Sequence, residues 1–197
     1  MLKTAIAAGV LGLCLLTSAQ AEDDDVIQSI NEGLEFYQGG EFAEATSSLN
    51  YAVQLIQQKK GESLGGLLPE PLEGWAAEDS QSQAAGAAMF GGGVTAERRY
   101  TRGSSRIDIR IVTDSPMLQG IMMMFSNPMF ATADGGKMER IGRQKAIVKY
   151  NGAGKSGDVQ MVVDNRFLVT VEGDAVSRDE LLAYAGAIDT KKLADLP

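Results

Sequence analysis

Methionines form the densest group of side chains in this chain that could bind a ligand directly. Five of its nine methionines lie in the sixteen residues from 115 to 130, SPMLQGIMMMFSNPMF. Thioether sulfur is a soft ligand that suits cuprous copper, so a Cu(I) site is one interpretation of this stretch. The chain has no histidine, and its one cysteine, Cys14, lies near the N-terminus, so no stronger ligand supports such a site. We expect no other metal and no cofactor.

The same stretch also has the pattern of an amphipathic helix. Ser115 suits a helix N-cap, Pro116 suits the first helical position, and Asn127-Pro128 suits the end, so we expect a helix over residues 116–126. The preferred interpretation is that this helix closes the core against a sheet, because methionine adapts to irregular gaps. The alternative is one wall of a groove for an apolar ligand or lipid. The residues of that candidate groove are Met117, Ile121, Met122, Met124 and Phe125.

Five arginines between residues 98 and 110 form a second group, in a chain that is otherwise acidic. Residues 94–102 and 105–113 alternate in polarity around Gly103-Ser104, which predicts a β-hairpin in which facing residue numbers sum to 207. That register pairs Arg99 with Asp108, so the arginines are mostly a solvated charge ladder. The same register also pairs Glu97 with Arg110, Tyr100 with Ile107, and Ala96 with Ile111.

Arg98 is the exception in this ladder. The predicted register places it opposite Ile109, on the apolar face of the hairpin. An inward arginine needs either a partner or a path for its head group to reach solvent. We therefore treat Arg98 as a candidate anion site.

The chain is poorly equipped for catalysis. Without histidine it has no Ser-His-Asp triad, no histidine-ligated zinc and no imidazole base. The stretch GAGKSG at 152–157 is similar to a phosphate loop, but Lys149 stands where the first glycine belongs, and the loop is expected to join two strands. Carboxylates distant in sequence could still meet in the fold. We expect no enzyme and assign no catalytic residue.

The first 21 residues have the pattern of a secretory signal peptide. Lys3 precedes an apolar run from residue 5 to 16, and Ala19-Gln20-Ala21 predicts cleavage after Ala21. About twelve apolar residues are too few to span a bilayer. Leu13 before Cys14 is too bulky for a lipoprotein signal. We therefore expect an exported, periplasmic protein of a Gram-negative envelope.

The expected mature chain is acidic and lacks cysteine. Removal of Lys3 leaves 17 basic residues against 26 acidic ones, a net charge of −9. This balance argues against nucleic acid and against an anionic membrane surface as partners, because both need basic patches. Loss of the only cysteine fits an oxidising compartment.

Residues 22–60 predict a helical hairpin. Apolar residues recur at helical spacing from Val26 until Gly39-Gly40, and again from Phe42 to about Lys60. This stretch resembles a single tetratricopeptide-type (TPR) repeat, although Ser29 and Glu32 occupy positions that are usually large and apolar. The resemblance rests on Gly33, Phe36, Gly40, Phe42, Ala45, Leu49 and Ala52.

One such repeat cannot bury its own apolar face. The hairpin must therefore dock on the downstream domain, on another subunit or on a partner protein. The candidate partner-binding residues are Phe36, Tyr37, Phe42 and Leu49.

Residues 61–92 predict a linker with an extended, proline-containing lead-in to Trp75, and residues 93–197 predict a sheet domain. After the first β-hairpin and the methionine helix, four short strands and a helix with a Ser177-x-x-Glu180 capping box follow. We expect an α+β fold: an αα-hairpin plus a mainly antiparallel sheet of about six strands, covered by two helices. The four later strands are expected at residues 137–141, 146–150, 158–163 and 167–172.

The C-terminal two-thirds of the chain resembles small exported bacterial domains of the PsbP/Mog1-like or LolA-like kinds. The resemblance rests on Gly74-Trp75, GRQKAIVKY at 142–150, NRFLVTVEG at 165–173 and SRDELLAYAGAID at 177–189. Such families imply assembly factors, carriers or interaction domains more often than enzymes. We therefore expect a non-enzymatic protein-interaction or assembly module, with apolar-ligand carriage and Cu(I) binding as the alternatives.

Overall fold

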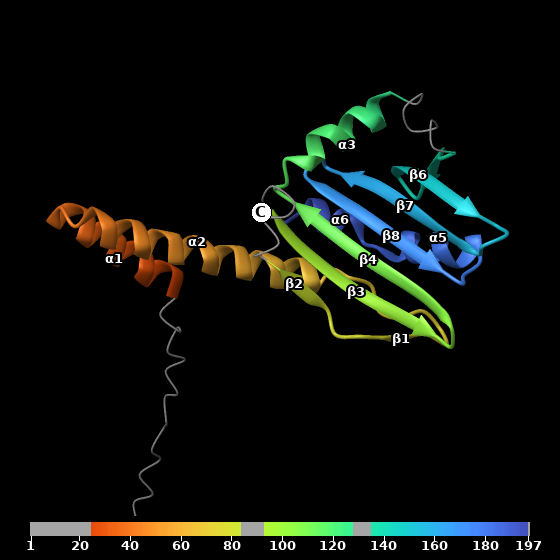
Figure 1. Ribbon diagram of the computed structural model, residues 1–197, viewed down its shortest axis with the longest axis horizontal. Coiled ribbons are helices and arrows are strands. Elements are labelled where there is room, and N and C mark those ends of the chain that lie inside the picture. The colour runs from red at the N-terminus through yellow and green to blue at the C-terminus, as the bar shows by residue number, and fades with distance from the viewer. Residues whose placement is uncertain (1–24, 84–92, 128–134, 197) are drawn as a thin grey trace, which may run out of the picture.

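A projecting pair of helices and an antiparallel sheet make up the protein (Figure 1). The computed structural model describes residues 25–83, 93–127 and 135–196. Helices α1 (Asp25–Gly39) and α2 (Phe42–Gly65) form the hairpin, and the end of α2 reaches the edge of the sheet. The fold is of the α+β class that the sequence predicts.

The sheet has eight strands rather than about six. The two additional strands, β1 and β2, are short and pair with the outer edge of β3, in a segment that the sequence analysis assigned to the linker. The main strands follow the order β3-β4-β8-β7-β6-β5, and every pair is antiparallel. The strands are β1 (Ala76–Ala77), β2 (Gln81–Gln83), β3 (Val94–Arg102), β4 (Ser105–Thr113), β5 (Lys137–Ile141), β6 (Gln144–Asn151), β7 (Ser156–Val163) and β8 (Phe167–Asp174).

The predicted register of the first β-hairpin is confirmed. Arg99 faces Asp108 and Arg98 faces Ile109, so facing residue numbers sum to 207 throughout. Gly103 has a φ of 60° in the turn, a conformation that glycine adopts without strain. The register therefore places one alternating set of side chains, including Ile107 and Ile111, on the buried face and the charged set on the other.

The buried face of the sheet is covered by α5 (Arg178–Ala187) and α6 (Thr190–Ala194), with the lead-in from residue 67 to 75 packed against the same core. The predicted capping box at the start of α5 is confirmed, because Ser177 accepts from the Glu180 amide and Glu180 accepts from the Ser177 amide. The hydrogen bond from the Ser177 amide, together with the one from Arg102, lowers the pKa of the Glu180 carboxyl group.

Helix α3 (Met117–Ser126) does not close the core as expected. It lies beyond one end of the sheet (Figure 1), and none of its side chains that the structure describes belongs to the main cluster of buried side chains. Other segments cover that core, among them the end of α2, which continues past its predicted end to Gly65 and contributes Leu64 to the cluster. Gly61 allows this approach, because a Cβ there would lie 2.9 Å from Ser82 Cβ.

Three aromatic rings anchor the lead-in to the core. Trp75 meets Tyr184 edge-on at 5.3 Å between ring centroids, and Tyr184 lies 4.7 Å from Tyr100. The Tyr100 hydroxyl donates a 2.6 Å hydrogen bond to the Pro69 carbonyl. Burial raises the pKa of Tyr100 to about 12, so this hydroxyl keeps its proton at physiological pH.

Within residues 25–83, 93–127 and 135–196, no helix combines the length and the apolar character that crossing a bilayer requires. The segment predicted as a signal peptide lies outside the described residues.

Candidate functional site

The hairpin is held together by small side chains, which turns its large ones outward. On α1 the residues that face α2 include Ser29 and Gly33, and on α2 the buried positions include Ala45 and Ala52. The helices approach so closely that a Cβ on Gly33 would lie 2.7 Å from Leu49 Cγ. The large apolar residues therefore cannot all fit between the helices.

These large residues form one continuous surface, which we call the hairpin face. On both α1 and α2, these large residues come one position later in the sequence than residues that face the other helix. In an antiparallel pair of right-handed helices, that one-residue offset turns both sets toward the same side of the pair. The rings of Tyr37 and Phe42, 5.7 Å apart between centroids, join the two rows at the tip. The hairpin face consists of Ile27, Ile30, Leu34, Tyr37, Phe42, Leu49, Val53 and Ile56.

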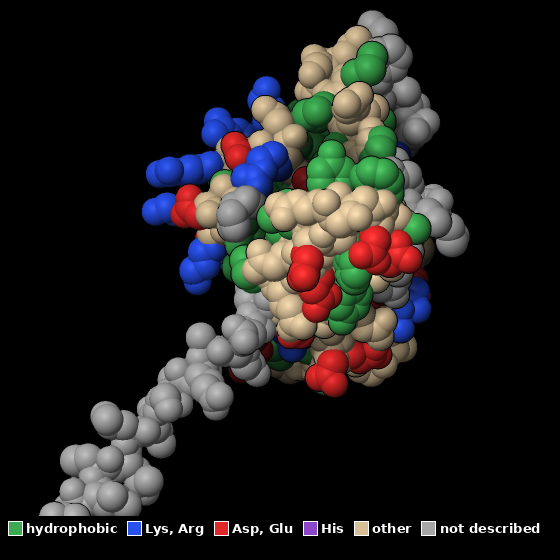
Figure 2. Space-filling model, turned by 90° about the vertical axis from the view of Figure 1, so that its left-hand side faces the viewer, with side chains coloured by type: hydrophobic (Ala, Val, Ile, Leu, Met, Phe, Trp, Pro, Cys, Tyr) green, Lys and Arg blue, Asp and Glu red, His purple; other side chains and the backbone are tan. Residues whose placement is uncertain are grey.

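The hairpin face is open to solvent. Its eight side chains are between 39% and 64% exposed. Of the ten large hydrophobic side chains that are exposed among the described residues, nine lie on these two helices. In Figure 2, which looks at the end of the molecule from which the hairpin projects, hydrophobic side chains appear among acidic ones. Contiguous apolar surface of this kind marks interaction sites in soluble proteins.

Three of the four residues proposed for partner binding lie on this surface. Tyr37, Phe42 and Leu49 are exposed there, whereas Phe36 is half-buried on the side that faces α2. The predicted partner-binding residues did not include Ile27, Ile30, Leu34, Val53 or Ile56. The signal that could have found them is a second apolar row on each helix, displaced by one residue from the inward-facing row.

Arg98 is anchored to the lead-in by the protein itself. Its Nε donates a 2.9 Å hydrogen bond to the Glu78 carbonyl, and a terminal nitrogen donates to the Pro69 carbonyl at 3.4 Å. The Glu70 carboxylate lies 3.9 Å away. The guanidinium group thus has two carbonyl oxygens and a carboxylate as partners. This arrangement suits an arginine that holds the lead-in in place better than an arginine that binds an external anion.

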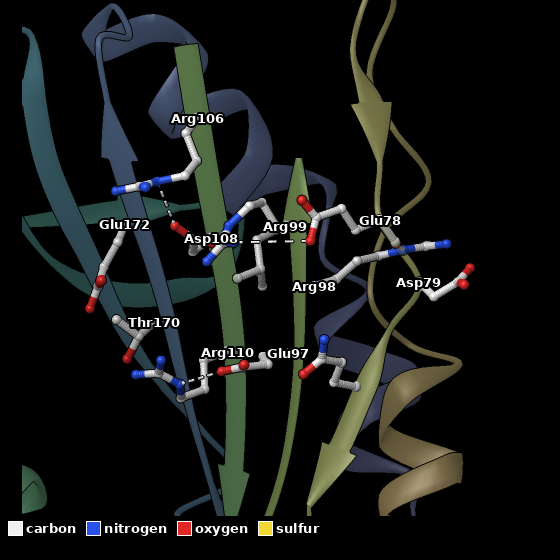
Figure 3. A pocket seen from close by; sticks show the side chains of 12 residues that line it. Glu78, Asp79, Glu97, Arg98, Arg99, Arg106, Asp108, Arg110, Thr170 and Glu172 are labelled. Carbon is white, nitrogen blue, oxygen red and sulfur yellow. Dashed lines mark hydrogen bonds and ion pairs between the residues drawn. The ribbon is translucent and has the colours of Figure 1, made fainter. Parts of the chain in front are cut away.

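The uncovered face of the sheet carries the predicted charge ladder (Figure 3). Arg99 lies 2.7 Å from Asp108, Arg106 lies 3.1 Å from the same carboxylate, and Arg110 lies 3.2 Å from Glu97. These pairs line a hollow of about 340 Å³ above β3, β4 and β8. Because the arginines lining this hollow have carboxylate or carbonyl partners, it offers no uncompensated positive charge to an anion.

Helix α3 borders two further hollows, of about 610 and 450 Å³, beside the turn from β5 to β6. Met122 and Phe125 supply apolar lining, and Arg143 and Lys145 line the same larger hollow. Of the five candidate groove residues, Met122 and Phe125 line these hollows, and Ile121 and Met124 are half-buried. The side chain of Met117 lies outside what the structure describes.

The remaining methionines that the structure describes do not form one cluster. Met123 on α3 is 69% exposed, Met138 on β5 lines the smaller hollow together with Phe125, and Met161 is fully buried in the core. Over the described parts of the chain, no three histidine, cysteine, aspartate or glutamate side chains come together in a group that could hold a metal ion. The loop GAGKSG joins β6 to β7, so it does not open a helix as a phosphate loop does.

No protein-family model matches this chain, and no curated protein or solved structure is significantly similar to it.

Proposed function

We propose that this chain is an exported, non-enzymatic interaction or assembly module that binds protein through the hairpin face. The observation that supports this most directly is that the apolar surface is concentrated on α1 and α2. A hairpin that packed on its own sheet would have these side chains buried, yet only the end of α2 reaches the sheet. The resemblance of the hairpin to a TPR repeat, whose helices commonly bind other proteins, agrees with this proposal.

The chemistry of the surface suits protein rather than a small molecule. Its side chains are spread along two helices, and none of the hollows described above lies over them. Helical faces of this type bind another helical or apolar surface through side chains spaced three or four residues apart. Aromatic side chains such as Tyr37 and Phe42, at the tip, are typical anchors of protein interfaces.

Two exposed residues on the hairpin allow a matched test. Leu34 lies on the hairpin face and is 52% exposed, and Tyr51 lies on the other side of α2 and is 53% exposed. A glutamate at position 34 should prevent binding, because it would leave a carboxylate unpaired in an apolar contact. The same change at position 51 should leave binding intact.

The experiment compares the proteins captured from an envelope extract by immobilised wild type, Leu34→Glu and Tyr51→Glu, with further copies of this chain counted as a partner. We expect wild type and Tyr51→Glu to retain the same partner and Leu34→Glu to lose it. Equal capture by all three proteins, or capture by none, would contradict the proposal.

A second candidate function is carriage of an anionic amphiphile at α3. It is favoured by the combination of an apolar wall, Met122 and Phe125, with the cations Arg143 and Lys145 in a chain of net charge −8. Apolar walls with a few placed charges are typical of ligand sites of several hundred Å³. Titration of palmitate, followed by native mass spectrometry, should show one bound copy, which Arg143→Glu weakens. Absence of a stoichiometric complex would exclude this function.

A further inference from the structure

The hairpin face has the spacing of a helix-bundle seam. On α1 its residues follow intervals of three, four and three positions. On α2 the intervals are four, three, four and three when Thr46 is included, and the Thr46 hydroxyl is satisfied by a 2.8 Å bond to the Phe42 carbonyl. Two helices with such seams on the same side form half of a four-helix bundle. The partner that matches this half best is another helical pair with the same spacing.

The area of the face agrees with a stable dimer. Its eight side chains are each about half exposed, so together they offer the surface of about four complete large side chains. At ~200 Å² for each, a value for aromatic side chains and so an upper limit for the aliphatic ones, the face measures at most roughly 800 Å². A standard protein interface buries about 800 Å² on each partner, so one copy of this face can cover another.

The charges around the face favour a copy of the same acidic chain. Next to the seam on the solvent side lie uncharged residues, Asn31 and Gln38 on α1 and Asn50 and Gln57 on α2. At the base of the seam, Lys60 is paired with Asp114 of the sheet domain. A basic partner would find no row of carboxylates here, whereas a second acidic chain would meet only the isolated carboxylate of Glu35, which directly follows Leu34.

The position of the hairpin determines how two copies can meet. It projects from the edge of a wider sheet domain (Figure 1), so two hairpins docked in the same direction would bring both domains to one end. If the two hairpins dock in opposite directions, their sheet domains lie at opposite ends of the helical bundle. A two-fold axis across the middle of the face then places α1 against α1 of the second copy, with Asn31 near its own counterpart.

On these observations we infer that the hairpin face binds a second copy of this chain, forming an antiparallel four-helix bundle with the sheet domains at opposite ends. This inference rests on the proposed function, because it names the partner of the same surface.

The test measures the molar mass of the purified protein over micromolar concentrations by light scattering and sedimentation. We expect wild type and Tyr51→Glu to be dimers. Leu34→Glu should weaken the dimer at least about a hundredfold, since the two-fold axis buries two unpaired carboxylates at once. The fluorescence of Trp75, the only tryptophan, should be unchanged and so show that the sheet domain remains folded.

Disulfide cross-linking tests the orientation in a Cys14→Ser background. Asn31→Cys should cross-link to its own counterpart under mild oxidation, and Gln38→Cys, near the tip, should not. Cross-linking through position 38 in place of position 31 would overturn the reversed arrangement.

The outcomes separate this inference from the proposed function. A wild type that stays monomeric, with a different captured protein that Leu34→Glu releases, would overturn the second-copy inference and leave the interaction function standing. A monomer that captures nothing would contradict both. A dimer that Leu34→Glu leaves intact would place self-association elsewhere and overturn the inference.

Discussion

The hairpin and the sheet domain use the same kinds of apolar residue in opposite ways. In the sheet, alternate side chains such as Ile109 and Val171 are fully buried under α5, α6 and the lead-in. In the hairpin, side chains of the same size, such as Ile27 and Leu34, are about half exposed. Periodicity therefore shows which residues share a face, and the neighbouring elements decide whether that face is covered.

The contrast has a simple physical cause. The sheet core needs volume, so large side chains point inward and small ones are exceptions. One exception is Gly173, where a Cβ would lie 2.6 Å from Val176 Cγ2. The inward row of the hairpin is built instead from residues such as Ser29, Gly33 and Ala52, which bring the helices close and leave little volume between them. The sheet gains hydrophobic free energy by burying its apolar side chains within one chain. The hairpin face would gain the same kind of free energy only when a partner covers it, as proposed above.

The first prediction tests the contrast directly, with one truncation in each region. Phe167→Ala should cost the sheet domain about 3–5 kcal/mol, because the Phe167 side chain is fully buried. Leu34→Ala should change the stability of that domain by less than about 0.5 kcal/mol. Urea unfolding followed by Trp75 fluorescence measures both. If Leu34→Ala cost as much as Phe167→Ala, the hairpin face would have to be buried against the sheet.

The second prediction tests whether close approach is what turns the large residues outward. Gly33→Val should cost the hairpin about 1–3 kcal/mol through overpacking against Leu49 and the Ala45 carbonyl. Hydrogen exchange of the α1 amides should accelerate, while the Trp75 unfolding midpoint stays unchanged.

Gly39→Val is the matched control for this change. A Cβ at Gly39 would meet only the mobile end of the Glu41 side chain, at 3.3 Å. Equal exchange rates in the two variants would show that the helices are not closely packed at Gly33.

The sheet illustrates what local patterns predict well. The register of β3 and β4 followed from a two-residue turn and from the pairing of Arg99 with Asp108, both of which are local. The capping box at Ser177 is also local, and it is confirmed. The short strands β1 and β2 could not be predicted, because only the exposed edge of β3 makes them strands.

The places where prediction failed depend on long-range packing. Gly61 has the appearance of a helix stop, but its missing side chain is what lets α2 continue past Ser82. The sequence between residues 116 and 126 gave a helix close to the observed bounds, yet it could not show that other segments would occupy the core first. Three of the four candidate hairpin residues lie on the exposed row, because the sequence shows the spacing of that row and does not show which side of the hairpin stays uncovered.

The third prediction extends the comparison to the two faces of the sheet and has the smallest expected effect. Asp158 lies on the face opposite α5, across from Lys149 on β6 and Glu172 on β8. Burial raises the pKa of Asp158 above its ordinary value of 3.8, and this outweighs Lys149 and the hydrogen bond from Gln160, which lower it. The folded state thus binds a proton at Asp158 more tightly than the unfolded state does.

The stability that this proton supplies is present below pH 3.8 and is lost as the pH rises through the higher folded pKa of Asp158. Asp158→Asn should therefore stabilise the protein by a few tenths of a kcal/mol at neutral pH, where ionised Asp158 opposes folding. The gain should vanish below about pH 3.8. Urea unfolding at pH 7 and pH 3.5 measures the difference. If the stability of Asp158→Asn relative to wild type instead rose on acidification, the attraction of Lys149 would outweigh burial at Asp158. The charge pairs on the uncovered face would then contribute to the stability of the sheet.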